Sequence, residues 1–206
     1  MKIKMKRKLL VGLTVLGLAT VLLTSCSKVP QVEIDAANAA IEEAKLAGAE
    51  MYVHDNYVAL QDSMNAVMVS IEAQKSKFFK NYSTVKEHLS GVSMFAQEVK
   101  IQAENRKEEL KAEIQNTVAE VSALTETNKQ LVTEAPKGKE GTSALLAIKD
   151  ELSTIEASIN EVSTMLANGD YLPALDKANA AKEKATAINT ELSEVIAKYK
   201  GVKGKK

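Results

Sequence analysis

Residues 143–173 read SALLAIKDELSTIEASINEVSTMLANGDYLP. Apolar side chains recur in this segment at alternating intervals of three and four residues: Leu145, Ile148, Leu152, Ile155, Ile159, Val162 and Leu166. This spacing puts them on one face of a helix and is typical of a helix packed on another helix. Asn168-Gly169-Asp170 predicts the end of that helix, because Asn and Gly tolerate the left-handed conformation and Asp170 can cap the next helix. Pro173 is compatible with the first turn of the new helix.

The second helix continues the pattern toward the C-terminus. Its predicted packing side consists of Leu175, Ala178, Ala181, Ala185, Ile188, Leu192, Val195 and Tyr199. A loop this short makes the two helices antiparallel, so residues 143–200 are expected to form a helical hairpin. The three small residues Ala178, Ala181 and Ala185 predict a close approach of the helices near the loop.

A similar pattern occurs earlier in the chain. Six residues are identical or similar to those 88 positions further on: Ala59, Leu60, Asp62, Met64, Val67 and Ile71 match Ala147, Ile148, Asp150, Leu152, Ile155 and Ile159. Tyr82 matches Tyr171 at an offset of 89. One hypothesis is a duplicated hairpin with residues 78–82 as its loop. The alternative is that two unrelated amphipathic helices share the same spacing.

Three further helical features precede the C-terminal hairpin. The alanine-rich segment Ile34 to Glu50 is expected to be a helix, followed by a kink before a helix that Asp55 or Asn56 caps. Thr84 with Glu87 three residues later predicts a capping box for a long return helix that ends near Thr133. The polar residues 104–109 weaken the apolar seam of that helix and predict an exposed or bent segment.

The predicted fold is all-α, with elongated antiparallel helical hairpins in a coiled-coil-like bundle. The expected divisions are a signal peptide at 1–25, a tether at 26–33, an N-terminal helical region at 34–135, a loop at 136–142, a C-terminal hairpin at 143–200 and a basic tail at 201–206. Aromatic residues make up only 4% of the chain and tryptophan is absent. This composition favours long helices with a thin buried seam.

The first 26 residues have the pattern of a secretion signal. Residues 1–8 contain five basic side chains and no acid, and Leu9 to Leu23 carries no charge. This apolar run is shorter than the about 20 residues that a spanning helix needs, so a cleaved signal is favoured over an uncleaved anchor. Leu23-Thr24-Ser25-Cys26 resembles the lipobox of bacterial lipoproteins. That resemblance implies cleavage between Ser25 and Cys26, thioether lipidation of Cys26 and acylation of its amino group by a fatty acid such as palmitate.

The residues after Cys26 bear on location. In enterobacterial lipoproteins an aspartate directly after the lipidated cysteine favours inner-membrane retention, whereas Ser27 is compatible with the outer membrane. Some other bacteria use acidic residues at this point for surface export, and Ser27 to Pro30 lacks them. The resemblance therefore implies a lipid anchor in the outer membrane, facing the periplasm. Cys26 is the only cysteine, so no intramolecular disulfide is possible.

The charge balance argues against nucleic acid as a partner. The chain has 27 basic and 27 acidic residues, but five basic residues lie in the signal. Removing them leaves 22 basic against 27 acidic residues, a net charge of about −5. Nucleic-acid binding requires a concentrated basic surface.

No catalytic, metal or cofactor site is predicted, and the chain is interpreted as a non-enzyme. His54 and His88 lack the spacing of metal ligands, and adjacent acids such as Glu42-Glu43 diverge on a helix. No serine lies in a nucleophile elbow and no glycine-rich loop is present. Methionines on or beside apolar stripes are assigned to core packing: Met51, Met64, Met68, Met94 and Met165.

The chain as a whole resembles alanine-rich helical envelope lipoproteins, including a family of uncharacterised hairpin domains with turns like Gly169-Asp170-Tyr171. The first functional hypothesis is a spacer, scaffold or docking surface that packs on a protein partner or on a second copy. The alternative is a carrier or sensor that holds a small hydrophobic ligand beside the small residues of Ala178 to Ala187.

The basic C-terminus allows a further comparison. The segment Lys198 to Lys206 distantly resembles that of the murein lipoproteins, in which the final lysine is joined to peptidoglycan. Tyr199 lies seven residues before Lys206, with glycines between, which departs from that pattern. A solvated tail with weak affinity for anionic surfaces is the default interpretation.

Overall fold

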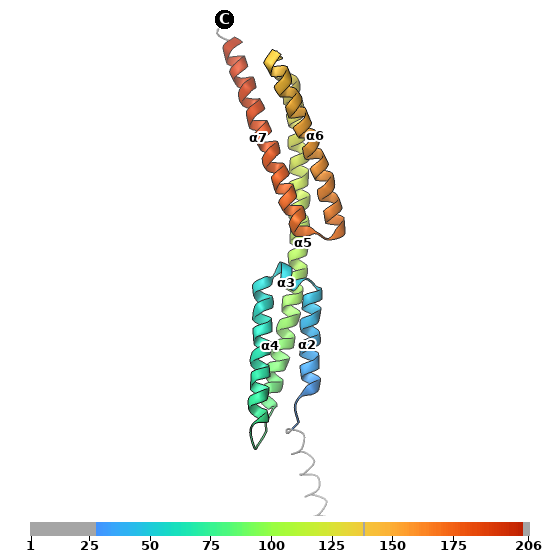
Figure 1. The fold of residues 1–206 in the computed structure, drawn as a ribbon, viewed down its shortest axis with the longest axis vertical. Coiled ribbons are helices and arrows are strands. Elements are labelled where there is room, and N and C mark those ends of the chain that lie inside the picture. Colours follow the sequence, from blue (N-terminus) through green and yellow to red (C-terminus); the bar gives the residue numbers. More distant parts are fainter. Residues whose placement is uncertain (1–27, 138, 204–206) are drawn as a thin grey trace, which may run out of the picture. The chain divides into compact units, whose positions relative to one another are not determined.

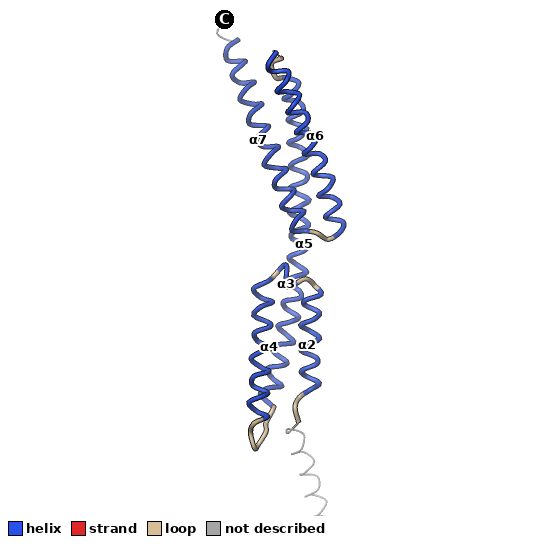
Figure 2. Tube along the Cα trace, viewed as in Figure 1, coloured by secondary structure: helices blue, strands red, loops and turns tan. Residues whose placement is uncertain are grey.

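The computed structural model describes residues 28–137 and 139–203, and this part of the chain contains six helices and no strand. The helices are α2 (Gln31–Leu46), α3 (Ala49–Tyr52), α4 (His54–Lys75), α5 (Ser83–Glu134), α6 (Lys139–Asn168) and α7 (Tyr171–Lys203) (Figures 1 and 2). The predicted all-α fold is confirmed. The chain divides into two compact units between Arg106 and Lys107, inside α5 and not at the expected loop 136–142. We call them unit 1 and unit 2.

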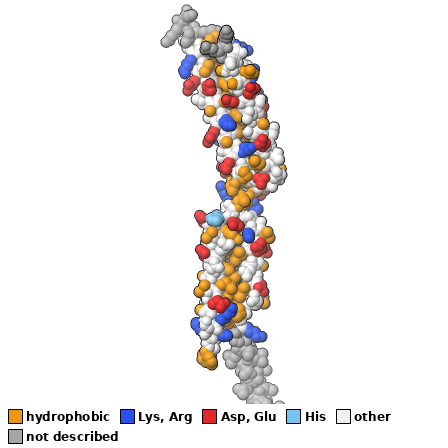
Figure 3. All heavy atoms as spheres, in the orientation of Figure 1, with side chains coloured by type: hydrophobic (Ala, Val, Ile, Leu, Met, Phe, Trp, Pro, Cys, Tyr) orange, Lys and Arg blue, Asp and Glu red, His pale blue; other side chains and the backbone are white. Residues whose placement is uncertain are grey.

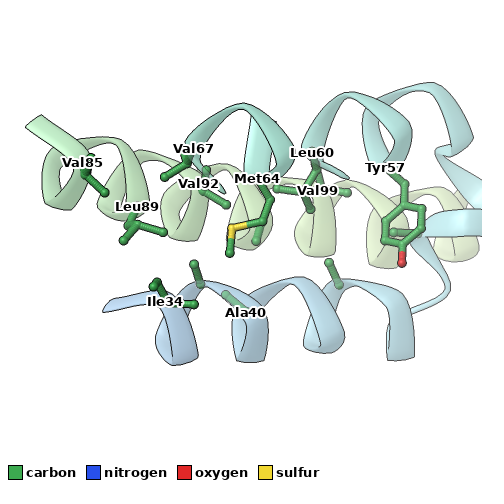
Figure 4. Close-up of a cluster of buried hydrophobic side chains, with 14 of the residues drawn as sticks. Ile34, Ala40, Tyr57, Leu60, Met64, Val67, Val85, Leu89, Val92 and Val99 are labelled. Atoms are coloured by element: carbon green, nitrogen blue, oxygen red, sulfur yellow. The ribbon is translucent and has the colours of Figure 1, made fainter. Parts of the chain in front are cut away.

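Unit 1 is a bundle of three antiparallel helices: α2, α4 and the first part of α5. Figure 4 shows Ile34 of α2, Leu60 and Met64 of α4 and Leu89 of α5 pointing into one core. The face that α2 contributes consists mainly of alanines, which are buried at Ala37, Ala40 and Ala44. Because these side chains are short, the backbone of α2 can approach the other two helices closely.

The connection between α2 and α4 is tighter than the sequence suggested. The helix expected to run from Ile34 to Glu50 ends at Leu46, and Gly48 adopts a φ of +87°. This left-handed conformation turns the chain into the short helix α3. The following helix already begins at His54, so Asp55 and Asn56 lie inside its first turn and do not precede it as predicted caps.

The connection between α4 and α5 also differs from prediction in its cap. Helix α5 begins at Ser83, whose backbone N–H donates to the Asn81 side-chain oxygen at 3.0 Å. The Ser83 hydroxyl donates to the same oxygen at 2.9 Å. Thr84 and Glu87 therefore lie within the helix and do not form the predicted capping box. Asn81 takes that role because its short side chain reaches a backbone donor two residues on.

Unit 2 is a second three-helix bundle. The predicted hairpin is present as α6 and α7, and the second part of α5 packs on both of them through Val121, Val132 and Ala135. A third helix covers the sides of the seam that a two-helix hairpin would leave in water. Helix α6 begins at Lys139, four residues before the expected Ser143, and α7 extends to Lys203 within the predicted tail.

The last turns of α7 correct one detail of the predicted packing side. Ile196 is buried, whereas Val195 and Tyr199 are each 42% exposed. Leu192 and Ile196 are four residues apart, so the seam takes its longer interval at this point. The sequence allowed either choice, and the facing residues of α5 and α6 decide it.

The two units bury corresponding positions. Each of six buried residues of α2 and α4 corresponds to a buried residue 88 positions on: Ala37, Ala40, Ala44, Leu60, Met64 and Val67 correspond to Thr125, Asn128, Val132, Ile148, Leu152 and Ile155. An offset of 89 relates Val85, Leu89, Val92, Ala96, Val99 and Ala103 to Ala174, Ala178, Ala181, Ala185, Ile188 and Leu192, all of them buried. The offset of 88 holds across α2, α4 and their connection, and the offset of 89 holds along α5. This agreement favours duplication of a three-helix unit, which is larger than the hypothesised hairpin.

The polar residues 104–109 separate the two cores without ending the helix. Ala103 and Leu110 are buried on either side, while Glu104, Glu108 and Glu109 are exposed. The predicted weakening of the seam therefore coincides with the boundary between the units.

Two glycines of unit 1 provide a test of this backbone geometry. A Cβ at Gly48 would lie 2.8 Å from the Tyr52 ring, in a conformation that costs a non-glycine residue about 1–2 kcal/mol. Gly91 lies on the exposed face of α5 with nothing within 4 Å of a Cβ. We expect Gly48→Ala to lower the free energy of unfolding by at least about 1 kcal/mol and Gly91→Ala to raise it by about 0.5–1 kcal/mol, measured by urea denaturation. Equal effects of the two substitutions would contradict the Gly48 turn.

Candidate functional site

The predicted lipid-attachment site, Ser25 and Cys26, lies outside the described residues. The described chain begins at Lys28, and Val29 is already partly buried against the core of unit 1. Pro30 is buried, and its carbonyl accepts from the backbone N–H of Ile34 at 3.1 Å. Residues 29–33, which were predicted to belong to a tether, are therefore part of the bundle.

This burial limits how far Cys26 can lie from unit 1. Three residue steps separate Cys26 from Val29, and an extended chain covers at most about 3.3–3.6 Å per residue. Cys26 is therefore held within about 11 Å of Val29, whatever the conformation between them. A group bonded to its sulfur would keep this end of unit 1 close to it.

The same end of unit 1 contains the start of α2, the loop 76–82 and the start of α5 (Figure 1). Lys86 of α5 forms an ion pair with Glu33 of α2 at 2.6 Å, which joins the first turns of the two helices. The hydrogen bond from Lys86 lowers the pKa of the Glu33 carboxyl. Lys86 is exposed and Glu33 is partly exposed, so the pair contributes little to stability.

The loop 76–82 carries two aromatic side chains in solvent. Phe78 is 93% exposed and Phe79 is 85% exposed, and their rings meet edge to face with centroids 5.0 Å apart. Figure 3 shows hydrophobic atoms at the tip of this loop. The sequence indicated a loop here but not its apolar tip. Two adjacent phenylalanines between lysines, in a chain with three phenylalanines in all, were the available signal.

Unit 2 buries a polar cluster that the sequence interpretation missed. Asn128 of α5 is 0% exposed, and its side-chain amide donates to the Ala185 carbonyl of α7 at 2.7 Å. The Asn189 amide donates to the Asn128 oxygen at 2.8 Å. A buried asparagine in a helical seam fixes which residues face each other, because any shift leaves its amide without partners. The signal was an asparagine at a position where the heptad spacing calls for an apolar residue.

The histidines lie apart from each other on exposed helix surfaces. His54 Nδ1 lies 3.2 Å from the Glu50 carbonyl oxygen, and His88 is exposed on α5. Within residues 28–137 and 139–203, no three His, Cys, Asp or Glu side chains group as metal ligands would.

The methionine prediction was right at Met64, which is buried, and wrong at Met51 and Met94, which are 63% and 72% exposed. Met68 is 37% exposed, and Met165 packs against the core of unit 2 as a partly buried side chain. Met94 lies two residues from both Val92 and Ala96, which places it on the opposite face of α5, and Met51 lies in the short helix α3.

The small residues proposed for a ligand space are packed against other helices. Ala178, Ala181 and Ala185 are all buried, and they contact side chains of α5 and α6. A nearby surface groove of about 270 Å³ is lined by Ile155, Ala180 and Ala181 together with polar residues. These observations favour close helix contact over ligand binding at this place.

Comparison of the chain with protein families, with curated proteins and with solved structures found no match. Among the helices of the described residues, none has an apolar segment of the length that crossing a bilayer requires.

The Asn128 cluster yields a stability prediction. Asn128→Ala removes one buried and one partly buried hydrogen bond and leaves a small cavity, so we expect the free energy of unfolding to fall by about 1–3 kcal/mol. Asn179→Ala, on the exposed face of α7, is the matched control and should change it by less than about 0.5 kcal/mol. Thermal and urea unfolding measure both. An unchanged Asn128→Ala protein would show that the cluster does not hold α7 on α5.

Proposed function

We propose that the protein is a lipid-anchored, non-enzymatic envelope protein that acts as a spacer, scaffold or docking surface through its helices. The observation that carries this proposal is the position of Cys26. It follows an apolar run and precedes the first packed residue, Val29, by three positions. We infer that the lipid sits in the outer membrane and that unit 1 begins directly at the periplasmic face.

The energetics of acyl chains support a durable attachment. Burial of each methylene group contributes about 0.8 kcal/mol, and a single chain gives only reversible binding. The two or three chains that a lipobox implies would hold the protein stably on the membrane. With residues 29–33 packed into the bundle, the attachment positions unit 1 at the bilayer surface without a long flexible linker.

The outer faces of unit 1 support a docking role. Several apolar side chains of α4 and α5 remain in solvent, including Val69, Met94 and Ile101. A groove of about 420 Å³ runs between these helices and is lined by small residues such as Ser63, Ala66, Ser70 and Gly91. Small side chains allow the backbone of a further helix to approach, which is the way an amphipathic helix docks in a groove. The partner we propose is therefore helical, either another envelope protein or a second copy.

The anchor has a direct test. Cys26→Ala should move the protein from the membrane fraction to the soluble periplasm or leave its signal uncleaved, because the sulfur that accepts the lipid is gone. Ser27→Ala is the matched control and should keep both the membrane location and the added mass of the lipid. Fractionation and intact mass spectrometry measure these outcomes. A parent protein with no mass beyond its polypeptide would contradict the proposal.

The docking role has a separate test. A photocrosslinking amino acid at His88, which lines the α4–α5 groove, should give a discrete adduct in intact cells, either with one other envelope protein or with a second copy. The same probe at Glu151, an exposed position of α6, is the control and should not give that adduct. Mass spectrometry identifies the product. Equal labelling at both positions would argue that this face has no specific partner.

A further inference from the structure

We propose that the loop 76–82 is a second membrane contact, in which Phe78 and Phe79 enter the interfacial region of a bilayer that carries anionic headgroups. This inference rests on the proposed lipid anchor for its location. The contact itself depends on the side chains of the loop and can be measured independently of the lipid.

The exposure of the two rings is the first argument. Phe78 and Phe79 are 93% and 85% exposed, and together they form one apolar tip. A contiguous apolar patch at the tip of a loop indicates a surface that is covered in the functional state. The two rings do not contribute to the core of unit 1, so their presence is not explained by folding.

The duplicated architecture gives the second argument. The equivalent connection in unit 2, between α6 and α7, consists of only Gly169 and Asp170, and Gly169 adopts a φ of +86°. The same change of direction is therefore made in this chain with two residues and no exposed aromatic tip. The loop of unit 1 has seven residues because α4 ends at Lys75, whereas the matching part of unit 2 stays helical as far as Asn168. The residues of unit 1 that leave the helix include both phenylalanines. The longer loop is thus not required to connect two antiparallel helices.

The position of the loop indicates that the surface covering the two rings is a bilayer. The loop lies at the end of unit 1 where the described chain begins, next to the Lys86–Glu33 ion pair between the first turns of α5 and α2. Cys26 lies within about 11 Å of Val29 at this end. An acyl chain on Cys26 would bring a bilayer surface to the same end, where the aromatic tip can reach it.

The charge of the loop agrees with contact to a bilayer that carries anionic headgroups. Residues 76–82 contain Lys77 and Lys80 and no acid. Lys75, just before the loop, is paired with Glu72 at 2.7 Å, whereas no ion pair of the described residues involves Lys77 or Lys80. Lysines that flank apolar side chains keep their ammonium groups at the headgroup level while the apolar tip enters the interface.

The absence of tryptophan from the chain allows a precise test. Phe78→Trp places the only indole of the full-length lipidated protein at the tip. The protein is reconstituted into phosphatidylethanolamine–phosphatidylglycerol vesicles with brominated acyl chains. We expect the emission to shift to shorter wavelength and to be quenched about twofold, because bromine quenches only an indole that enters the bilayer. Phe79→Trp is a second variant with the same expected result.

A matched control lies in the same unit. Leu46→Trp places the indole at a site that is 77% exposed, at the other end of α2. The 16 residues of α2 span about 24 Å, so this indole should remain unquenched in the same vesicles. Lys77→Gln combined with Lys80→Gln should reduce the quenching of Phe78→Trp on anionic vesicles and leave it unchanged on purely zwitterionic ones.

The outcomes separate the tip from the anchor. Flotation with vesicles that depends on Cys26, together with unquenched Phe78→Trp and Phe79→Trp, would overturn the tip contact and leave the anchor intact. Quenching of both variants in protein whose intact mass shows no lipid would support the tip contact while the anchor proposal fails. A dimer in native mass spectrometry that Phe78→Ser abolishes, without quenching by brominated lipid, would show that the rings bind a second copy and would also overturn the inference.

Discussion

A helix with apolar side chains at alternating intervals of three and four residues is stable in water only when that stripe is covered by other helices. This requirement organises both units. In each of them three helices meet around a seam of Val, Leu, Ile and Ala side chains. The helices are amphipathic and carry charged residues outward, and the only aromatic side chains buried in the described cores are Tyr57 and Tyr82 of unit 1.

The cores of the two units differ in the contacts that fix the alignment of their helices. In unit 1 the buried face of α2 is mainly alanine, and small side chains permit close packing of the helices. At the corresponding positions unit 2 has Thr125 and Asn128, and the Asn128 amide is bound to the Ala185 carbonyl. A buried amide gives less stability than an apolar side chain of similar size but selects one alignment of helices. Unit 2 therefore fixes the arrangement of its helices by a polar contact, whereas unit 1 relies on shape.

The end of unit 1 near Cys26 brings together features that lie far apart in the sequence. The first turn of α2, the first turn of α5 and the loop 76–82 meet there because α4 runs antiparallel to both helices. Both proposals concern this end. The lipid would provide attachment, and the phenylalanine tip would provide a second point of contact that orients unit 1 on the bilayer.

The sequence by itself determined the all-α fold, the hairpin of α6 and α7 and the turn at Gly169, because heptad spacing and a left-handed glycine are local signals. It also predicted a lipid-attachment site at Cys26, because a basic start, an apolar run and a short motif precede it in that order. Tertiary structure decided what depends on contacts between distant segments. Examples are the third helix in each unit, the division of the chain inside α5 and the choice of Ile196 over Val195 for the core. It also decided that Asn128 is buried and that Phe78 and Phe79 are not, since spacing gives the face of a helix but not which neighbours cover it.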